Sequence, residues 1–498
     1  MRRLSEGSLS ELAPSARRPG YDWRRLPVGM AHIGVGAFHR CHQAEFTDDM
    51  LAARFGPWGV VGINLRAPRL ADLLAGQDHL YTRTLREGER AETRLIGSIR
   101  RSLDVDDAAS AEAAIAELAS PTLKAVTITV TEKGYGLVPA TGALDRENPL
   151  IRQDLAGGAP PRTLLGLLAL ALERRRALNA PLTLISCDNV PSNGALLRSA
   201  MLAFAGARSA PLARWIEVNV AFPSTMVDRI VPATTPADIE RIASEIGAVD
   251  EAAVVGEPFR QWVIEDRFAG DRPPWDLAGA QFVRDAKPYE TIKMRALNGA
   301  QSTLSHLGAL VGHEFSFEAA SDPLLLALTR RMLERETAST LPLVEGMAVQ
   351  PYIDSSLARI QNTAIRHRCH QIGTDGSQKI RQRILDPLRE RLAKGESASL
   401  LTLAASGWIA YVLVGAARFG RRWAPSDPWA DTVIALGERS GEDFEGLAKS
   451  ALGISAIFGT DLASPQLSQA IGEHLCGLLA GDPRAYLAGI AARERTEV

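Results

Sequence analysis

The chain has 498 residues, of which 46% are hydrophobic, and its 56 lysines and arginines nearly balance its 58 aspartates and glutamates. This length and apolar content allow two domains, each with its own core. A net charge close to zero creates no overall field toward nucleic acid or an anionic membrane. The composition therefore favours a small-molecule partner, with no nucleic acid and no membrane.

The cysteines and the N-terminal segment bear on the compartment. The four cysteines, at positions 41, 187, 369 and 476, lie far apart with no C-x-x-C pair, which argues against a disulfide framework or a zinc site and fits a reducing, cytoplasmic setting. Residues 1–28 are basic but lack the apolar run of a signal peptide, so we expect a poorly ordered or surface arm. The apolar stretch 400–417 is predicted to be a buried core helix.

The first half of the chain alternates short apolar runs with amphipathic stretches such as "RTLLGLLALALERRRALN" (162–179). This alternation predicts an α/β fold with a parallel sheet and helices on its faces. From "KPYE" onward, helical periodicity continues to the C-terminus, so we expect an α/β domain over 29–283 and a mostly α-helical domain over 284–498. The predicted strands are "MAHIGVG" (30–36), "WGVVGINL" (58–65), "LKAVTITV" (123–130), "PLTLISC" (181–187) and "WIEVNVAF" (215–222).

The first predicted strand ends in "GVGAFHR", which places Gly34 and Gly36 in the turn before a helix. Glycines there let the backbone turn tightly and approach a pyrophosphate, which indicates a Rossmann-type dinucleotide site. His39 replaces the third glycine of the usual fingerprint, so an ordinary glycine-rich turn is the alternative. After the second strand, Arg66 and Arg69 could accept a 2′-phosphate, which keeps NADP open beside NAD; two solvated loop arginines are the other interpretation.

Polar residues follow three later strand ends, in "TEKGYG", "CDNVPSNG" and "PSTMVDR". Ligands of open α/β sheets bind beyond the carboxyl ends of the strands, so Glu132, Asp188, Asn189 and Asp228 form a candidate site. Each residue taken alone is more typical of a cap or a turn.

The second domain opens on a predicted helix that contains "KMRALNGAQSTLSH" (293–306) and runs from about Pro288 to Gly308 or Gly312. Gly299 costs stability inside a helix, which suggests close approach by a ligand or another backbone.

Three polar residues of this helix fan across one broad side. In an α-helix, Gln301 lies about 80° and Asn298 about 140° around from Lys293. One pocket could use all three residues; a surface lysine with two polar neighbours on a core helix is the alternative.

These motifs together resemble the polyol-specific long-chain dehydrogenases, also called the mannitol dehydrogenase family. The resemblance runs from about residue 30 to at least 390. It implies a Rossmann-type N-terminal domain, a largely helical C-terminal domain, a cleft between them and NAD(P)-dependent oxidation without zinc. The motifs that carry it are "HIGVGAFHRCHQAEFTDDML", "TVTEKGYG", "SCDNVPSNG", "FPSTMVDRIVP", "EPFRQWVIEDRF", "KPYETIKMRALNG" and "DGSQK".

The resemblance also implies residue roles. The family's K-x-x-x-x-N-x-x-H motif places the general base at Lys293 and an amide that stabilises the alkoxide oxygen at Asn298, with a second such amide at Asn189. Glu132 would relay the proton to water. The residues expected to contact the cofactor are Gly34, Gly36, Phe38, His39, Arg40, Arg66 and Arg69.

By the same resemblance, Asp228 and Lys379 would hold substrate hydroxyls, but the motif's histidine is Gln301 in this chain. Glutamine can donate to a hydroxyl, yet it cannot change charge near neutral pH. This departure leaves a second class of function open: a dinucleotide-binding protein whose catalysis is weakened or repurposed.

Substrate choice depends on "IRHRCHQIGTDGSQKIRQR", which resembles the fructuronate reductase branch. The carboxylate of a sugar acid would bind a cationic side chain such as that of Arg368. We therefore expect D-mannonate and D-fructuronate before D-mannitol and D-fructose or another polyol, in a monomer or small homo-oligomer. A solvated helix face is the alternative interpretation of the basic residues, which are Arg366, Arg368, Lys379, Arg381 and Arg383.

Overall fold

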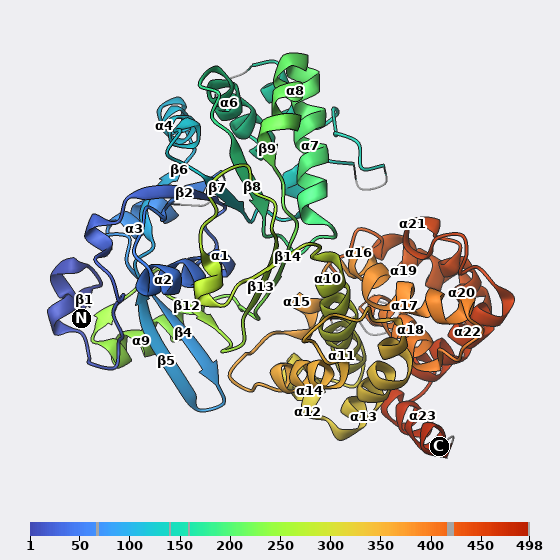
Figure 1. Cartoon of the computed structure of the whole chain (residues 1–498). Coiled ribbons are helices and arrows are strands. Elements are labelled where there is room, and N and C mark those ends of the chain that lie inside the picture. The colour runs from blue at the N-terminus through green and yellow to red at the C-terminus, as the bar shows by residue number, and fades with distance from the viewer. Residues whose placement is uncertain (66–68, 139–140, 158–159, 416–422, 497–498) are drawn as a thin grey trace. The chain divides into compact units, whose positions relative to one another are not determined.

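In a computed structural model of the chain, the structure describes residues 1–65, 69–138, 141–157, 160–415 and 423–496 (Figure 1). The chain divides into two compact units, Met1–Lys287 and Pro288–Val498. The boundary expected at residue 283 coincides with the end of the last strand, β14 (Gln281–Val283).

The main sheet of unit 1 has six parallel strands in the order β6-β3-β2-β7-β8-β9. Counted along the chain, this order is 3-2-1-4-5-6, the order of a Rossmann dinucleotide-binding sheet, so the predicted α/β fold is confirmed. The strands are β2 (Val28–Ile33), β3 (Gly59–Asn64), β6 (Ile99–Asp104), β7 (Ala125–Ile128), β8 (Leu182–Ser186) and β9 (Val220–Ala221).

Successive side chains of these strands point to opposite faces of the sheet, and because the strands are apolar along their length, both faces are apolar. Ala31 and Val61 belong to a core shared with one group of helices, whereas Met30 and Val60 pack with α2 (Gln43–Ala53) and β13 (Gln261–Glu265) on the other face. Figure 1 shows the first group gathered on one side of the sheet. It consists of α4 (Ala108–Ala119), α6 (Leu164–Ala177), α7 (Asn193–Arg208) and α8 (Ala210–Asn219).

Smaller sheets complete unit 1, in the orders β12-β4-β5, β10-β13-β14 and β1-β11. Their other strands are β1 (Arg2–Arg3), β4 (Tyr81–Glu87), β5 (Arg90–Ile96), β10 (Thr225–Asp228), β11 (Ala248–Val249) and β12 (Val254–Gly256). The further helices of the unit are α1 (Ala37–Cys41), α3 (Leu70–Ala75), α5 (Pro149–Leu155) and α9 (Pro236–Ile246).

Residues 1–28, expected to form a poorly ordered or surface arm, have many exposed residues but dock on unit 1 through buried leucines. β1 pairs with β11, and Leu4, Leu9 and Leu12 are buried in a cluster that also contains Leu80. The apolar residues of this segment follow neither a helix nor a strand period, so its docking depends on long-range contacts that no local pattern encodes.

The strand predicted over 215–222 is wrong for most of its length, because residues up to Asn219 continue α8. Ser209 caps this helix, Pro211 suits its first turn, and Leu212 and Ile216 are buried one helical turn apart. Only Val220 and Ala221 extend the main sheet beside β8.

The described elements of unit 2 are helices, as predicted. Most of the stretch 400–417 lies in α18, where the residues from Leu400 to Leu413 are all buried; residues 416 and 417 lie outside the described residues. Within the described ranges, no helix has the length and apolarity needed to cross a membrane. The helices are α10 (Lys287–Lys293), α11 (Gly299–Leu310), α12 (Ser316–Ser321), α13 (Pro323–Arg331), α14 (Val349–Ile360), α15 (Cys369–Gly373), α16 (Gly376–Ile380), α17 (Asp386–Ala393), α18 (Ser399–Val414), α19 (Ala430–Ser440), α20 (Phe444–Leu452), α21 (Ser455–Phe458), α22 (Pro465–Leu479) and α23 (Pro483–Thr496).

Candidate active site

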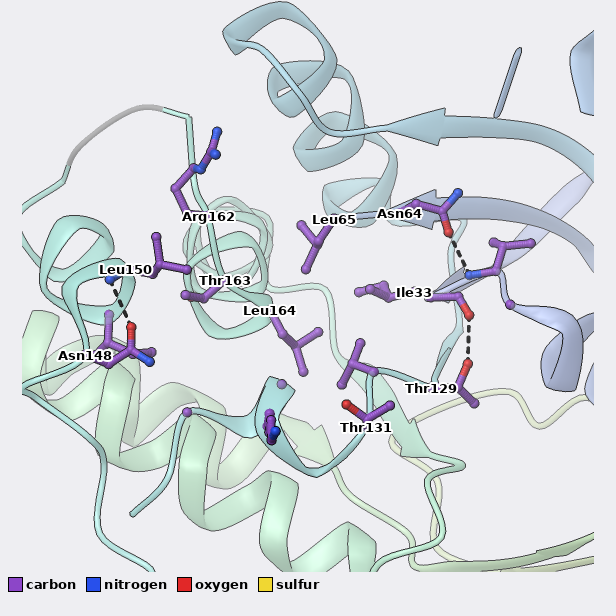
Figure 2. Close-up of a pocket in the computed structure, with 18 residues that line it drawn as sticks. Ile33, Asn64, Leu65, Thr129, Thr131, Asn148, Leu150, Arg162, Thr163 and Leu164 are labelled. Atoms are coloured by element: carbon purple, nitrogen blue, oxygen red, sulfur yellow. Dashed lines mark hydrogen bonds between the residues drawn. The ribbon is translucent and has the colours of Figure 1, made fainter. Parts of the chain in front are cut away.

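A pocket of about 300 Å³ lies at the carboxyl ends of β2 and β7 (Figure 2). The strand order of the sheet reverses between these two strands, which is where Rossmann sheets bind dinucleotides. The pocket is lined by the turn 34–36 after β2, by Asn64 and Leu65 at the end of β3, by the segment after β7, and by Thr163 and Leu164 at the start of α6.

The two glycines of the turn have different tasks. Gly34 has a φ of +94°, and a Cβ there would lie 2.0 Å from the carbonyl oxygen of Thr129, so only glycine lets the turn pack on β7. Gly36 caps α1, and its nearest neighbour to a Cβ would be the Gly34 oxygen at 3.8 Å. Its bare backbone lines the pocket, which suits close approach by a diphosphate.

Asn64 fixes this turn, and the sequence analysis did not single it out. Its Oδ1 accepts from the Val35 amide at 2.8 Å, a bond drawn in Figure 2, and its Nδ2 donates to Asp104 Oδ1 at 2.8 Å. Asp104 in turn accepts from the Ala71 amide at 3.1 Å. A polar residue that ends an otherwise apolar strand was the signal that could have identified Asn64.

His39 and Arg40, predicted to contact the cofactor, are instead turned into the interior of unit 1. The His39 ring stacks on His32 with centroids 3.4 Å apart, and burial lowers its pKa well below the usual value. Arg40 donates to the carbonyl oxygen of Ala252. The physical reason is the single turn of α1, which carries its third and fourth side chains away from the pocket side of Gly36.

The other predicted cofactor residues are dispersed. Phe38 is partly buried and stacks on His42 with centroids 5.0 Å apart, and Arg66 lies outside the described residues. Arg69 is exposed and lies 3.8 Å from Asp72 in an ion pair. It lines a second pocket of about 640 Å³ that shares Asn64, Leu65 and Arg162 with the first and also has Asp72, Asp104 and Asp106 in its wall.

Asp188 joins the carboxyl ends of β7 and β8. Its carboxylate accepts from the amides of Val130 and Thr131 and from the Tyr135 hydroxyl. Burial raises the pKa of Asp188. Glu132 and Asn189, the predicted relay and amide, are exposed on the two segments that Asp188 joins.

Asn193 is a second residue that the sequence analysis missed. Its Nδ2 donates to the carbonyl oxygens of Asp188 and Thr225, both at 3.0 Å, and its Oδ1 accepts from the Thr225 amide at 2.9 Å. It thereby ties the end of β8 to β10, where Asp228 is buried opposite Gln261 in a different sheet. Asp228 was expected to follow a strand of the main sheet.

In unit 2, a π-helical turn separates α10 from α11. It spans Met294–Asn298, and the Gly299 amide donates to the carbonyl of Met294, five residues earlier. Because such bonds stack residues five apart, Lys293 and Asn298 lie on one face, and not about 140° apart as expected for an α-helix. Single π turns inside helices occur often at functional sites.

Lys293, Asn298 and Gln301 are all buried on this helix. Asn298 Nδ2 lies 3.5 Å from Gln301 Oε1, at the limit of a hydrogen bond. The close approach predicted for Gly299 is made by another backbone, since a Cβ there would lie 3.1 Å from the Arg383 carbonyl oxygen.

The structure divides the basic cluster of 366–383 into two groups. Arg383 is buried and donates to Ser302 Oγ at 3.0 Å, and Lys379 donates to the carbonyls of Thr374 and Ile372. Burial, together with the Arg383 charge, lowers the pKa of Lys379 to about 8. Arg368, in contrast, is exposed and paired with Glu314.

His306 stays neutral, because burial, assisted by the nearby Arg383 and Lys379 charges, lowers its pKa to about 3. Among the residues that the structure describes, no three His, Cys, Asp or Glu side chains converge to hold a metal ion.

A Rossmann sheet with a pocket at its switch point, followed by a helical unit with a buried lysine and amides, defines a two-domain nucleotide-binding oxidoreductase. Residues 28–277 match the family model of the mannitol dehydrogenase Rossmann domain, and residues 285–478 match that of the mannitol dehydrogenase C-terminal domain. The chain belongs to the mannitol dehydrogenase family and is a dehydrogenase, as its motifs predicted.

Similar proteins cover nearly the whole chain. The D-mannonate oxidoreductase of Escherichia coli is 40% identical over 91% of this chain and 93% of its own. The mannitol 2-dehydrogenase of Phaeosphaeria nodorum is 37% identical over 92% of this chain and 80% of its own. The solved structure of Pseudomonas fluorescens mannitol 2-dehydrogenase, a ternary complex with NAD and D-mannitol, is 35% identical, with a TM-score of 0.88 over 98% of this chain and 99% of that one.

Proposed function

We propose that this protein is a NAD-dependent dehydrogenase that interconverts a secondary alcohol of an open-chain sugar acid and the corresponding ketone, with D-mannonate and D-fructuronate as the leading pair. The observation that carries the substrate class is Arg383. It is buried, and no carboxylate of the described residues lies within ion-pair distance of it. An uncompensated buried charge is costly, so a substrate carboxylate would stabilise it. The D-mannonate oxidoreductase relative supports the same class.

The chemistry assigned to the chain needs a base and donors to the reacting oxygen. Lys293 takes the hydroxyl proton in oxidation, and Asn298 and Asn189 stabilise the alkoxide oxygen. Glu132 passes the proton to water. The bound nicotinamide accepts or supplies the hydride. Asp228, Gln301 and Lys379 hold hydroxyls of the substrate.

The pocket fits a dinucleotide, because Gly36 leaves its backbone bare and Asn64 holds the turn before it. The choice of NAD over NADP rests on the second pocket. Its wall contains Asp72, Asp104 and Asp106, whose charges would repel a 2′-phosphate, and Arg69 is already paired with Asp72. The ternary complex of the Pseudomonas enzyme with NAD supports the same choice.

A second candidate substrate pair is D-mannitol and D-fructose, favoured by the similarity to mannitol 2-dehydrogenases such as those of Phaeosphaeria nodorum and Pseudomonas fluorescens. The other class, a dinucleotide-binding protein with weakened catalysis, is motivated by Gln301 at the position of the motif's histidine. The free cysteines, three of them buried, favour a reducing, cytoplasmic setting.

The test is the initial rate of NADH and NADPH oxidation with D-fructuronate and with D-fructose as separate substrates. We expect NADH-dependent reduction of D-fructuronate to be the faster, and Lys293→Ala to lower kcat by about 10²- to 10⁴-fold. Lys449→Ala is the matched control, since Lys449 is an exposed lysine of α20. Faster turnover of D-fructose would select the mannitol pair, and NADH binding without turnover of either ketose would contradict the proposal.

A further inference from the structure

Thr131 has a backbone conformation that residues other than glycine rarely adopt. Its φ is +67° and its ψ is 165°, a region that is essentially confined to glycine. The residue follows β7, lines the dinucleotide pocket (Figure 2), and precedes the turn Glu132–Tyr135 that carries the predicted proton relay. A strained backbone conformation persists only where the surrounding structure holds it in place. The contacts of this turn therefore identify the residues that stabilise Thr131.

Both ends of the turn are bound by one carboxylate. Asp188 Oδ1 accepts from the Thr131 amide at 2.9 Å, while Oδ2 accepts from the Val130 amide at 3.1 Å and from the Tyr135 hydroxyl at 2.7 Å. The Tyr135 side chain is fully buried, and its hydroxyl also lies 2.5 Å from Ser186 Oγ at the end of β8. The side chain of Thr131 makes no capping bond to the turn. The strained residue is therefore held through its backbone: its amide donates to Asp188, and its carbonyl oxygen accepts from the Gly134 amide at 3.0 Å within the turn.

Asp188 is itself rigidly placed. It is 8% exposed, lies two residues after the end of β8, and its carbonyl oxygen accepts from Asn193 Nδ2 at 3.0 Å. Charged acceptors of backbone amides give stronger hydrogen bonds than neutral ones, and more so in a desolvated site. The next residue in the chain is Asn189.

We propose that Asp188 is a positioning residue, whose carboxylate holds Thr131 in its glycine-like conformation and thereby fixes one wall of the dinucleotide pocket and the turn of Glu132 relative to the Asn189 segment. This inference rests on the proposed function and deepens it by adding a residue that touches neither cofactor nor substrate. Asp188, the polar residue that follows β8, then shapes the site but takes no part in the reaction itself.

The test uses Asp188→Asn in the full-length protein. The amide keeps the shape but replaces one acceptor oxygen by an NH₂ group, so either the Thr131 amide loses its acceptor or the Val130 amide and the Tyr135 hydroxyl both do. We expect a rise in the NADH dissociation constant, measured by protein fluorescence, and a fall in kcat of about 10- to 100-fold, since small displacements of positioned groups have effects of this size. Tyr135→Phe, which removes one bond and keeps the ring, gives a smaller change in the same direction.

Rescue separates positioning from general stability. Thr131→Gly removes the strain, so we expect the double variant Asp188→Asn/Thr131→Gly to recover most of the lost NADH affinity and kcat. The control is Asp188→Asn/Lys133→Gly, which puts the glycine two residues away and should recover neither. Wild-type affinity in Asp188→Asn, or a Thr131→Gly double variant no better than Asp188→Asn, would overturn the proposal. If Asp188→Asn fails to fold, the same rescue is measured on Tyr135→Phe. Because NADH affinity is read without a sugar, a wrong substrate assignment leaves this comparison intact.

Discussion

The ammonium group of Lys379 titrates within an ordinary assay range, because burial and the Arg383 charge lower its pKa to about 8. The charged form predominates below that pH and donates best to a substrate carboxylate or hydroxyl. We therefore expect KM for D-fructuronate to rise by about tenfold between pH 7 and pH 9, as Lys379 loses its proton. Lys379→Arg stays charged throughout and should remove this inflection, and a KM that is flat from pH 7 to pH 9 in the wild type would exclude Lys379 from substrate binding.

Gln301 can accept a hydrogen bond from Asn298 and donate one to a substrate in the same geometry, because its amide carries both groups on one carbon. An imidazole carries its donor and acceptor on different edges of the ring. Gln301→His should therefore lower kcat/KM for the preferred ketose by about tenfold, a loss of about 1.4 kcal/mol in transition-state stabilisation. Steady-state rates with NADH measure this. A large rise in turnover would instead favour the weakened-catalysis alternative.

At the scale of single elements, the sequence patterns correctly predicted those strands and helices that local interactions determine. The strands β2, β3, β7 and β8 were predicted because each is a short apolar run bounded by turn residues. The segment 215–219 was misassigned because its apolar residues suit a strand as well as a helix, and the Ser209 cap and Pro211 decide for the helix. The π turn of 294–298 left no local signal, since it forms where Gly299 meets the Arg383 backbone.

The strand–turn–helix element of 28–41 offers a matched pair of substitutions. Gly34→Ala would put a Cβ 2.0 Å from the Thr129 oxygen at a φ of +94°, so the free energy of unfolding should fall by at least about 2 kcal/mol. In Gly36→Ala, the added Cβ would make only an ordinary contact, 3.8 Å from the Gly34 oxygen, at a φ that any residue adopts, so stability should change by less than about 1 kcal/mol.

The same pair should separate stability from binding. The added methyl of Gly36→Ala lies on the pocket wall, and we expect NADH to bind about tenfold more weakly, or about 1.4 kcal/mol. Thermal unfolding and fluorescence titration of both variants measure the two effects. Equal losses of stability in the two variants would show that the turn is not held as the contacts indicate.

At the scale of the whole molecule, the change from alternating to helical periodicity predicted two domains, because each pattern reports how a segment buries its own apolar residues. The sheet order could not be predicted, since it depends on pairings between distant strands. The contacts of Asp188 and Asn193 were missed for the same reason: each joins segments that the chain separates by tens of residues. Arg368 and Arg383 both lie in a basic stretch, yet Arg368 is exposed and Arg383 is buried, and this difference depends on tertiary packing.

The hydrophobic cores follow the division into units. The core residues of unit 1 lie between Leu4 and Ala280, and those of unit 2 between Ile292 and Ala491. A unit with its own core can fold alone, so the fragment Met1–Lys287 should give a cooperative unfolding transition and bind NADH. It should reduce no ketose, because Lys293 and Asn298 lie beyond its end. Circular dichroism, fluorescence titration and rate assays measure these three properties, and the fragment carrying Gly36→Ala is the control for binding at the proposed pocket. A folded fragment that binds no NADH would mean that unit 2 contributes to the dinucleotide site, and detectable turnover would refute Lys293 as the base.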